Sequence, residues 1–254
     1  MAGLLLQNLS DGVLTLTFNR PDKKNALNIK MWIELREAFL QAQQNDQVNV
    51  VVLAGNGADF CAGVDLNDFG GADSEHPFES AARVICDFDK PLIGAAQGIA
   101  IGGGATILFH CDVVYVGESL RMRLPFANLG LVPEFASSYM LQANIGARRA
   151  AELFYTAEWI NADKAVDVGI ATAKYSDADL LEKAAAKAAE IAKWPVNALR
   201  ETKRCLKAAH KSGIDRALEV EHEGMKKQAG SPENIEAVMA FIEKRPADFK
   251  KLLK

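Results

Sequence analysis

The chain has 254 residues, of which 49% are hydrophobic and 24% are charged, and its net charge at pH 7 is −4. This composition is typical of a globular protein and excludes disordered and fibrous classes. The acidic balance offers no overall basic field for nucleic acid, and no run approaches the ~18 apolar residues of a membrane helix. Because the first ten residues contain no Lys or Arg, we expect no leader peptide and a cytoplasmic protein.

Cysteine and histidine show no metal-binding or disulfide spacing. The four cysteines form no C-x-x-C pair, and the four histidines lie far apart in the sequence. We therefore expect neither a metal site nor a disulfide framework. The cysteines are interpreted as small buried side chains.

Strands and helices alternate over the first two thirds of the chain. Residues 13–18 alternate between apolar and polar, which predicts a half-buried strand, and residues 4–6 before an Asp-Gly turn predict its hairpin partner. Further predicted elements are a helix at 29–43, buried strands at 48–53 and 91–97, a helix at 105–110 and a strand at 112–116. This order indicates an α/β fold.

The last third is predicted to be helical. Asn161, Ser176 and Ser231 each stand where a helix N-cap is expected, and Gly169 stands where the first of these helices ends. We place a boundary near Trp194, which gives a core at 1–194 and a helical region at 195–254. Acidic residues and Gly70-Gly71 between positions 66 and 78 predict a mobile surface segment.

Two glycine-rich turns are the most informative local feature. One spans residues 55–63 and the other spans 98–104, and each follows a predicted buried strand. Unpaired backbone N–H groups at such turns suit an anion or a developing oxyanion, although the same glycines also serve tight packing between strand and helix. The dinucleotide fingerprint fails at Phe60, and no Walker lysine follows either turn.

Glu134 is the carboxylate with the strongest chemical signal. It lies between Pro133 and Phe135, where burial would raise its pKa toward that of a useful general base. It could equally be a first-turn glutamate favoured by the helix dipole. Ser137 and Ser138 lack a nucleophile motif and read as helix-start residues. The pairs Lys23-Lys24 and Lys244-Arg245 could meet a phosphate or form a solvated face.

Three segments together resemble the crotonase (enoyl-CoA hydratase/isomerase) superfamily. They are residues 20–27 (RPDKKNAL), residues 60–66 (FCAGVDL), and residues 98–104 (GIAIGGG) followed by Cys111-Asp112. The resemblance extends from about Leu4 to residues 241–245, and the combination is far more specific than any single piece. It implies an α/β spiral of ββα units with a helical C-terminal trimerisation region, and a homotrimer or dimer of trimers.

The resemblance also implies a ligand and a set of site residues. Family members bind acyl-CoA thioesters, with coenzyme A as part of the substrate and no separate cofactor, and two backbone N–H groups hold the thioester oxygen. By motif, these donors are Val64 and Gly103. The residues implied in binding the coenzyme A part are Lys24, Ala26, Ala62, Gly63, Asp65, Leu66, Phe241 and Lys244.

The placement of carboxylates indicates which reaction the resemblance favours. Hydratases resemble one another in having glutamates at the positions that Thr106 and Phe126 occupy here, so a two-carboxylate hydration is not expected, and we expect these two residues to line an apolar acyl pocket. Glu134 stands where peroxisomal-type Δ3,Δ2-enoyl-CoA isomerases have their catalytic glutamate. Phe135 stands where relatives commonly have glycine, which predicts a narrower acyl pocket.

The expected activity is therefore a shift of the double bond of 3-enoyl-CoA to 2-enoyl-CoA, with Glu134 carrying the proton. Two alternatives stay open. The first is another one-carboxylate crotonase reaction, such as thioester hydrolysis, ring cleavage or a hydration. The second is a non-catalytic acyl-CoA-binding protein, for which substitution of Glu134 would change nothing.

Overall fold

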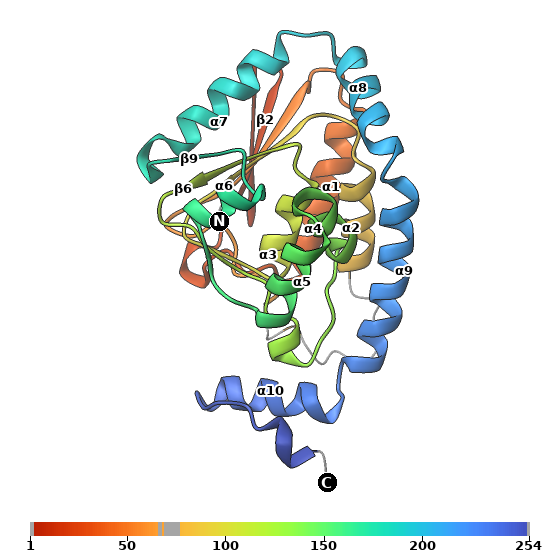
Figure 1. Cartoon of the computed structure of the whole chain (residues 1–254). Helices are drawn as coiled ribbons and strands as arrows, with labels where there is room; N and C mark the ends of the chain where they lie inside the picture. Colours follow the sequence, from red (N-terminus) through yellow and green to blue (C-terminus); the bar gives the residue numbers. More distant parts are fainter. Residues whose placement is uncertain (1–2, 66–67, 69–76, 253–254) are drawn as a thin grey trace.

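The computed structural model describes residues 3–65, 68 and 77–252 (Figure 1). A six-stranded sheet has the order β1 (Leu5–Ser10), β2 (Val13–Phe18), β3 (Val50–Gly55), β4 (Leu92–Ala96), β6 (Val113–Gly117) and β9 (Ala173–Tyr175). β1 and β2 pair antiparallel as a hairpin, and every other neighbouring pair in this sheet is parallel. The hairpin, the buried strands and the α/β class predicted from the sequence are thereby confirmed.

A second, smaller sheet has three strands. It contains β5 (Ile99–Ile101), β7 (Arg121–Arg123) and β8 (Ile160–Asn161). β4 is followed closely by β5 and then by a helix, and β6 is followed in the same way by β7 and then by helical segments. This repetition of two strands and a helix is the expected spiral of ββα units.

Helices cover both faces of the large sheet. α1 (Ile29–Gln44) begins at Asn28, whose side chain accepts the Met31 N–H, and α1 packs beside α2 (Phe78–Asp87) in the main core. α7 (Asp177–Ala192) packs on the opposite face, where Val50 and Ile93 meet its buried side chains. Figure 1 shows α7 on one side of the strands and α1 and α2 on the other. β3 and β4 are buried on both faces, as continuous apolar runs predict.

The sequence also located several helix ends. Asn161, Ser176 and Ser231 each accept a backbone N–H at the start of a helix, and the helix begun by Asn161 ends at Gly169. The helix predicted at 105–110 begins earlier, at Gly103, and is divided into α3 and a 3-10 segment. The remaining helical elements are η1 (Pro21–Lys23), α3 (Gly103–Thr106), η3 (Ile107–His110), η4 (Ala127–Leu129), α4 (Ser137–Ile145), α5 (Ala147–Thr156), α6 (Ala162–Val168), α8 (Val196–Ala208), α9 (Lys211–Gln228), α10 (Pro232–Ile242) and η5 (Phe249–Leu252).

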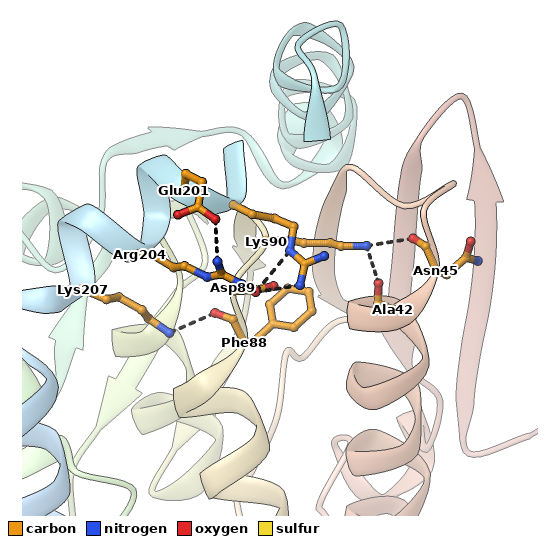
Figure 2. A network of polar contacts seen from close by, with 9 residues as sticks. Ala42, Asn45, Phe88, Asp89, Lys90, Glu201, Arg204 and Lys207 are labelled. Atoms are coloured by element: carbon orange, nitrogen blue, oxygen red, sulfur yellow. Dashed lines mark hydrogen bonds and ion pairs between the residues drawn. The ribbon is translucent and has the colours of Figure 1, made fainter. Parts of the chain in front are cut away.

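Helix α8 contacts the core through charged side chains. Its one buried side chain is that of Lys203, whose Nζ lies 2.8 Å from Asp112 Oδ2 and donates to the Lys90 carbonyl at 2.7 Å. Arg200 and Arg204 lie 2.8 and 3.1 Å from Asp89 Oδ2. In Figure 2, Arg204 and Lys207 point from α8 toward the segment of residues 88–90. Charge pairing therefore holds α8 in place.

The C-terminal helices extend away from the sheets. α9 runs beside α2 and α4, while α10 lies apart at one end of the molecule (Figure 1). α10 contacts η4 and carries exposed apolar side chains, with Phe241 62% and Ile242 65% exposed. Within the described ranges, no helix has the length and apolar character that crossing a bilayer requires.

Candidate active site

The two glycine turns lie against each other. Cys61 forms an isolated parallel bridge with Ala100, and Val64 forms one with Leu27. Gly63 has a φ of +86°, and a Cβ there would stand 2.5 Å from the Ile101 carbonyl oxygen and 3.6 Å from the Gly103 nitrogen. Glycine is therefore required at position 63 both for its backbone conformation and for this close approach. The second turn opens into α3 at Gly103.

Two backbone donors at this junction have no partner within the described chain. The neighbours of Val64 are bonded, since the Gly63 carbonyl accepts the Leu27 N–H at 2.7 Å and the Asp65 N–H donates to Leu27 at 3.0 Å. The N–H groups of Val64 and Gly103 donate to no described atom. Such donors suit an oxygen that gains negative charge.

Arg20 and Asn25 shape the loop beside the first turn. Arg20 donates to the Ala26 carbonyl and lies 3.0 Å from Asp65 Oδ2. Asn25 is fully buried with a φ of +55°, and its side chain accepts the Arg20 N–H and donates to two backbone carbonyls. These contacts hold residues 20–27 against residues 56–65.

The Glu134 carboxylate lies directly beside the second turn. Its Oε1 atom is 3.2 Å from the point where a Cβ on Gly103 would stand, and the Trp32 ring is 3.5 Å from the same point. Burial, together with the negative charge of Glu221, raises the pKa of Glu134 to about 7. A carboxyl group with this pKa can both take and return a proton near neutral pH.

Glu134 precedes a tight backbone reversal. Phe135 and Ala136 have φ values of +65° and +54°, a region that most side chains avoid. His110 Nε2 donates to the Phe135 carbonyl at 2.6 Å. The His110 and Phe135 rings are stacked, with centroids 4.9 Å apart. Helix α4 begins only at Ser137. Glu134 therefore lies before the helix, and its interpretation as a first-turn glutamate is wrong.

Comparison with known proteins identifies the family. The family model described as enoyl-CoA hydratase/isomerase matches residues 8–252. The chain belongs to the enoyl-CoA hydratase/isomerase family. It is 30% identical to 1,2-epoxyphenylacetyl-CoA isomerase of Escherichia coli K12, with 98% of this chain and 99% of that protein covered. It is 31% identical to 2,3-dehydroadipyl-CoA hydratase of the same organism, with 97% and 98% covered.

A solved structure of the family has the same fold. The crystal structure of an enoyl-CoA hydratase/isomerase from Pseudoalteromonas atlantica T6c superposes with a TM-score of 0.94 at 34% identity, covering 97% of this chain and all of that one. The crotonase fold expected from the sequence is therefore confirmed. The two relatives from E. coli differ in reaction, so membership of the enoyl-CoA hydratase/isomerase family leaves the subtype to the site itself.

Most of the predicted site residues of this family member lie around the two turns. Ala62 donates to the Lys24 carbonyl at 2.9 Å, and Lys24 is exposed. Thr106 lies on α3, fully buried, with its hydroxyl 3.4 Å from the Gly103 carbonyl. Phe126 is buried at the N-cap position of η4, and its ring contact is with Phe154 of α5 and not with either turn.

Three predicted residues fall outside this group. Phe241 near the end of α10 and Lys244 just beyond it are exposed, and among the described residues no hydrogen bond joins them to the two turns. Leu66 lies outside the described residues, as does most of the segment at 66–78 that was predicted to be mobile. Across the described ranges, no group of three His, Cys, Asp or Glu side chains is arranged to hold a metal ion.

Sequence reasoning missed three residues at the site. Trp32 lies in the helix predicted at 29–43 and Asn25 in the motif at 20–27, but neither was singled out as a site residue. The signal at Asn25 is its positive φ, a conformation that asparagine adopts more readily than most residues. Glu221 lies 87 positions beyond Glu134 on α9, and no local pattern connects the two. Its contact with the site exists only in the folded chain.

Proposed function

We propose that this chain is an isomerase that shifts the double bond of 3-enoyl-CoA thioesters to the 2-position. The observation that carries the proposal is the Glu134 carboxylate beside Gly103. The two positions that would hold carboxylates in a hydratase are Thr106 and Phe126, both buried and neither able to act as an acid or base. A 1,3-shift of a double bond needs only one proton carrier.

In the proposed reaction, the thioester oxygen accepts hydrogen bonds from the Val64 and Gly103 N–H groups. Ionised Glu134 removes a proton from C2, and the electrons move into a dienolate whose oxygen carries the negative charge. The protonated carboxyl then returns the proton to C4, which leaves the double bond between C2 and C3. No atom is gained or lost, and the carboxylate is regenerated. Each backbone donor contributes about 3–4 kcal/mol to a charged intermediate of this kind.

The surroundings of Glu134 support proton transfer without hydration. Trp32, Phe78 and Phe135 contact one another edge to face, with ring centroids 5.1 to 6.4 Å apart. Such a wall excludes water from the dienolate. These three rings also support a narrow acyl pocket, which the sequence predicted from Phe135 at a position where relatives commonly have glycine.

Binding of coenzyme A is proposed to use the loop of residues 20–27 together with residues 61–65. Lys24 is exposed at the edge of this surface, and Ala26 and Ala62 are partly exposed beside it. Asp65 is paired with Arg20, so we propose that it shapes the loop. Phe241 and Lys244 remain proposed coenzyme A contacts.

A homotrimer, or a dimer of trimers, is the proposed assembly, with residues 195–254 as the oligomerisation region. The exposed apolar residues Ile235, Phe241 and Ile242 on α10 support it, because a second copy would cover them. Sedimentation equilibrium at micromolar concentration should give three or six times the 27.5 kDa chain mass, and a stable monomer would contradict it.

The experiment that tests the reaction is incubation of the purified protein with trans-3-hexenoyl-CoA. The conjugated 2-enoyl thioester is followed by its absorbance, and Glu134→Gln is the matched variant. We expect wild-type turnover with conserved total thioester, and loss of turnover by a factor of about 10³ or more in the variant while coenzyme A binding is kept.

Other outcomes would replace the proposal. Release of free coenzyme A thiol would establish hydrolysis, and formation of a 3-hydroxyacyl product would establish hydration. If neither protein changes any thioester while both bind coenzyme A, the non-catalytic binding protein becomes the better interpretation.

A further inference from the structure

Glu221 is a buried carboxylate that the proposed reaction does not use. It lies on α9, and both of its oxygens accept backbone hydrogen bonds from the segment that follows Glu134. Oε2 accepts the Ala136 N–H at 2.7 Å, and Oε1 accepts the Ser138 N–H at 2.8 Å. The side chain is only 6% exposed, so these bonds form away from water.

The segment that Glu221 binds has no cap of its own. The N-cap position of α4 is Ala136, whose side chain offers no acceptor for the first N–H groups of the helix. Phe135 and Ala136 also have positive φ values, which cost energy for residues with a Cβ. A carboxylate at this point satisfies two N–H groups and complements the helix dipole.

Helix α9 is itself fixed against the helices around the site. Arg83 and Glu79 of α2 pair with Asp215 and His222 of α9. On the α4 side, the Tyr139 hydroxyl and His210 Nδ1 are 3.1 Å apart just before α9. Close packing adds to these bonds, because a Cβ at Gly213 would stand 2.3 Å from the Tyr139 ring. These contacts fix the position of α9, and with it Glu221, relative to α2 and α4.

We infer that Glu221 is a positioning residue for Glu134: its two hydrogen bonds hold the reversal at Phe135-Ala136 and thereby aim the Glu134 carboxylate at Gly103. The inference rests on the proposed function of Glu134 as the proton carrier. Because both Glu221 oxygens are occupied by backbone donors, Glu221 is not a second proton-transfer group, and the site keeps one working carboxylate.

Glu221 in its ionised form has a second effect on the site, through its charge. Burial raises the pKa of Glu221 itself, and the hydrogen bonds from Ala136 and Ser138 oppose this by favouring the carboxylate. Its repulsion adds to burial in raising the pKa of Glu134. Other titratable groups packed around the junction include His110, with Cys86 beside it, and the Tyr139–His210 pair. His110 is neutral at pH 7, because burial lowers its pKa to about 4. Removal of the Glu221 charge should therefore lower the pKa of Glu134, while its hydrogen bonds set the carboxylate position.

The test compares Glu221→Gln and Glu221→Asp with Glu223→Gln, an exposed residue on the same helix. The first readout is the titration of the Glu134 carboxyl carbon by NMR on protein labelled with ¹³C-glutamate, assigned by its absence in Glu134→Gln. The second is kcat and KM for trans-3-hexenoyl-CoA. Thermal melting and coenzyme A binding report whether each variant is folded.

We expect Glu221→Gln to lower the titration midpoint of Glu134 and to reduce kcat by about 10- to 100-fold, as misplacement of a reacting group does, with little change in KM. Glu221→Asp keeps the charge but is too short to reach both N–H groups, so kcat should fall while the midpoint stays near that of the wild type. Glu223→Gln should change neither quantity.

Folded Glu221→Gln and Glu221→Asp proteins with wild-type kcat would overturn the inference. If Glu221→Gln does not fold, the more conservative Glu221→Asp is the deciding variant. A lower kcat with an unchanged KM supports the inference, and a wild-type kcat overturns it. Failure of the proposed function looks different, because the wild-type protein itself then shows no conjugation. In that case the NMR titration still tests whether Glu221 acts on Glu134. An unchanged midpoint of Glu134 in folded Glu221→Gln would show that it does not.

Discussion

Oε1 of Glu134 lies 3.2 Å from the point where a Cβ on Gly103 would stand, although the two residues are 31 positions apart in the chain. A candidate backbone donor and a carboxyl group with a raised pKa therefore face the same small volume. The surrounding fold provides this geometry by pressing the two glycine turns together and reversing the chain after Glu134.

Replacement of Gly103 by alanine should block the site without unfolding the protein. Gly103 does not have a positive φ, so alanine is compatible with its backbone, but the new methyl group would crowd the Glu134 carboxylate at 3.2 Å. We expect kcat/KM to fall about 100-fold, since a 1 Å displacement of a reacting group has effects of that size. Gly3→Ala, where the nearest atom would be 3.5 Å away, is the control and should retain full activity.

The activity should rise with pH through the range set by Glu134. The carboxyl must be ionised to remove the C2 proton, and its pKa is raised to about 7 by burial and by Glu221. We expect kcat/KM for 3-hexenoyl-CoA to increase with pH up to about 7 and then to level off. A profile that is flat from pH 5 to 9 would show that Glu134 does not act as the base.

The same raised pKa makes a prediction for stability. The unfolded carboxyl ionises near its ordinary value of 4.5, and the folded one near 7, so wild-type stability is lost as pH rises between these values. Glu134→Gln cannot ionise and avoids this loss. Between pH 4.5 and 8, urea unfolding should show the variant gaining about 3 kcal/mol relative to the wild type. A constant difference across that range would contradict the assigned pKa.

Asn25→Ala should destabilise the loop beside the first turn. The substitution removes a buried amide that makes three hydrogen bonds, and it leaves alanine at a φ of +55°. We expect a loss of about 2–4 kcal/mol in the free energy of unfolding, together with weaker coenzyme A binding. Asn8→Ala, on the exposed side of β1, should have little effect on either measurement.

Asp89→Ala should loosen helix α8. Burial favours the neutral form of Asp89, but hydrogen bonds from Arg200 and Arg204 outweigh it and hold the pKa below the ordinary value. Removal of the carboxylate takes the acceptor away from the partly buried Arg200 guanidinium, while the exposed Arg204 keeps its contact with Glu201. The loss should cost about 2–4 kcal/mol at pH 7. The exposed Glu201, changed to alanine, serves as the control and should lower the unfolding free energy by less than about 0.5 kcal/mol.

The sequence by itself determined the elements and the chemistry that they carry. Period-two alternation and continuous apolar runs predicted β2, β3, β4 and β6, because side-chain burial in a sheet follows those periods. Side-chain capping at Asn161, Ser176 and Ser231 is local, so it could be read directly. The glycine turns, the Pro-Glu segment and the family resemblance identified the residues placed at the centre of the candidate site.

The tertiary structure decided which residues, distant in the sequence, contact one another at the candidate site. Contact between Gly63 and residues 101–103 depends on how the segments that follow β3 and β4 meet in space, and no local spacing encodes it. The N-terminal cap of α4 is also a feature that local sequence does not encode. Its own N-cap residue is Ala136, and the acceptor comes from Glu221, 85 positions later. A buried carboxylate is stable there only because the fold supplies two N–H groups that would otherwise lack partners.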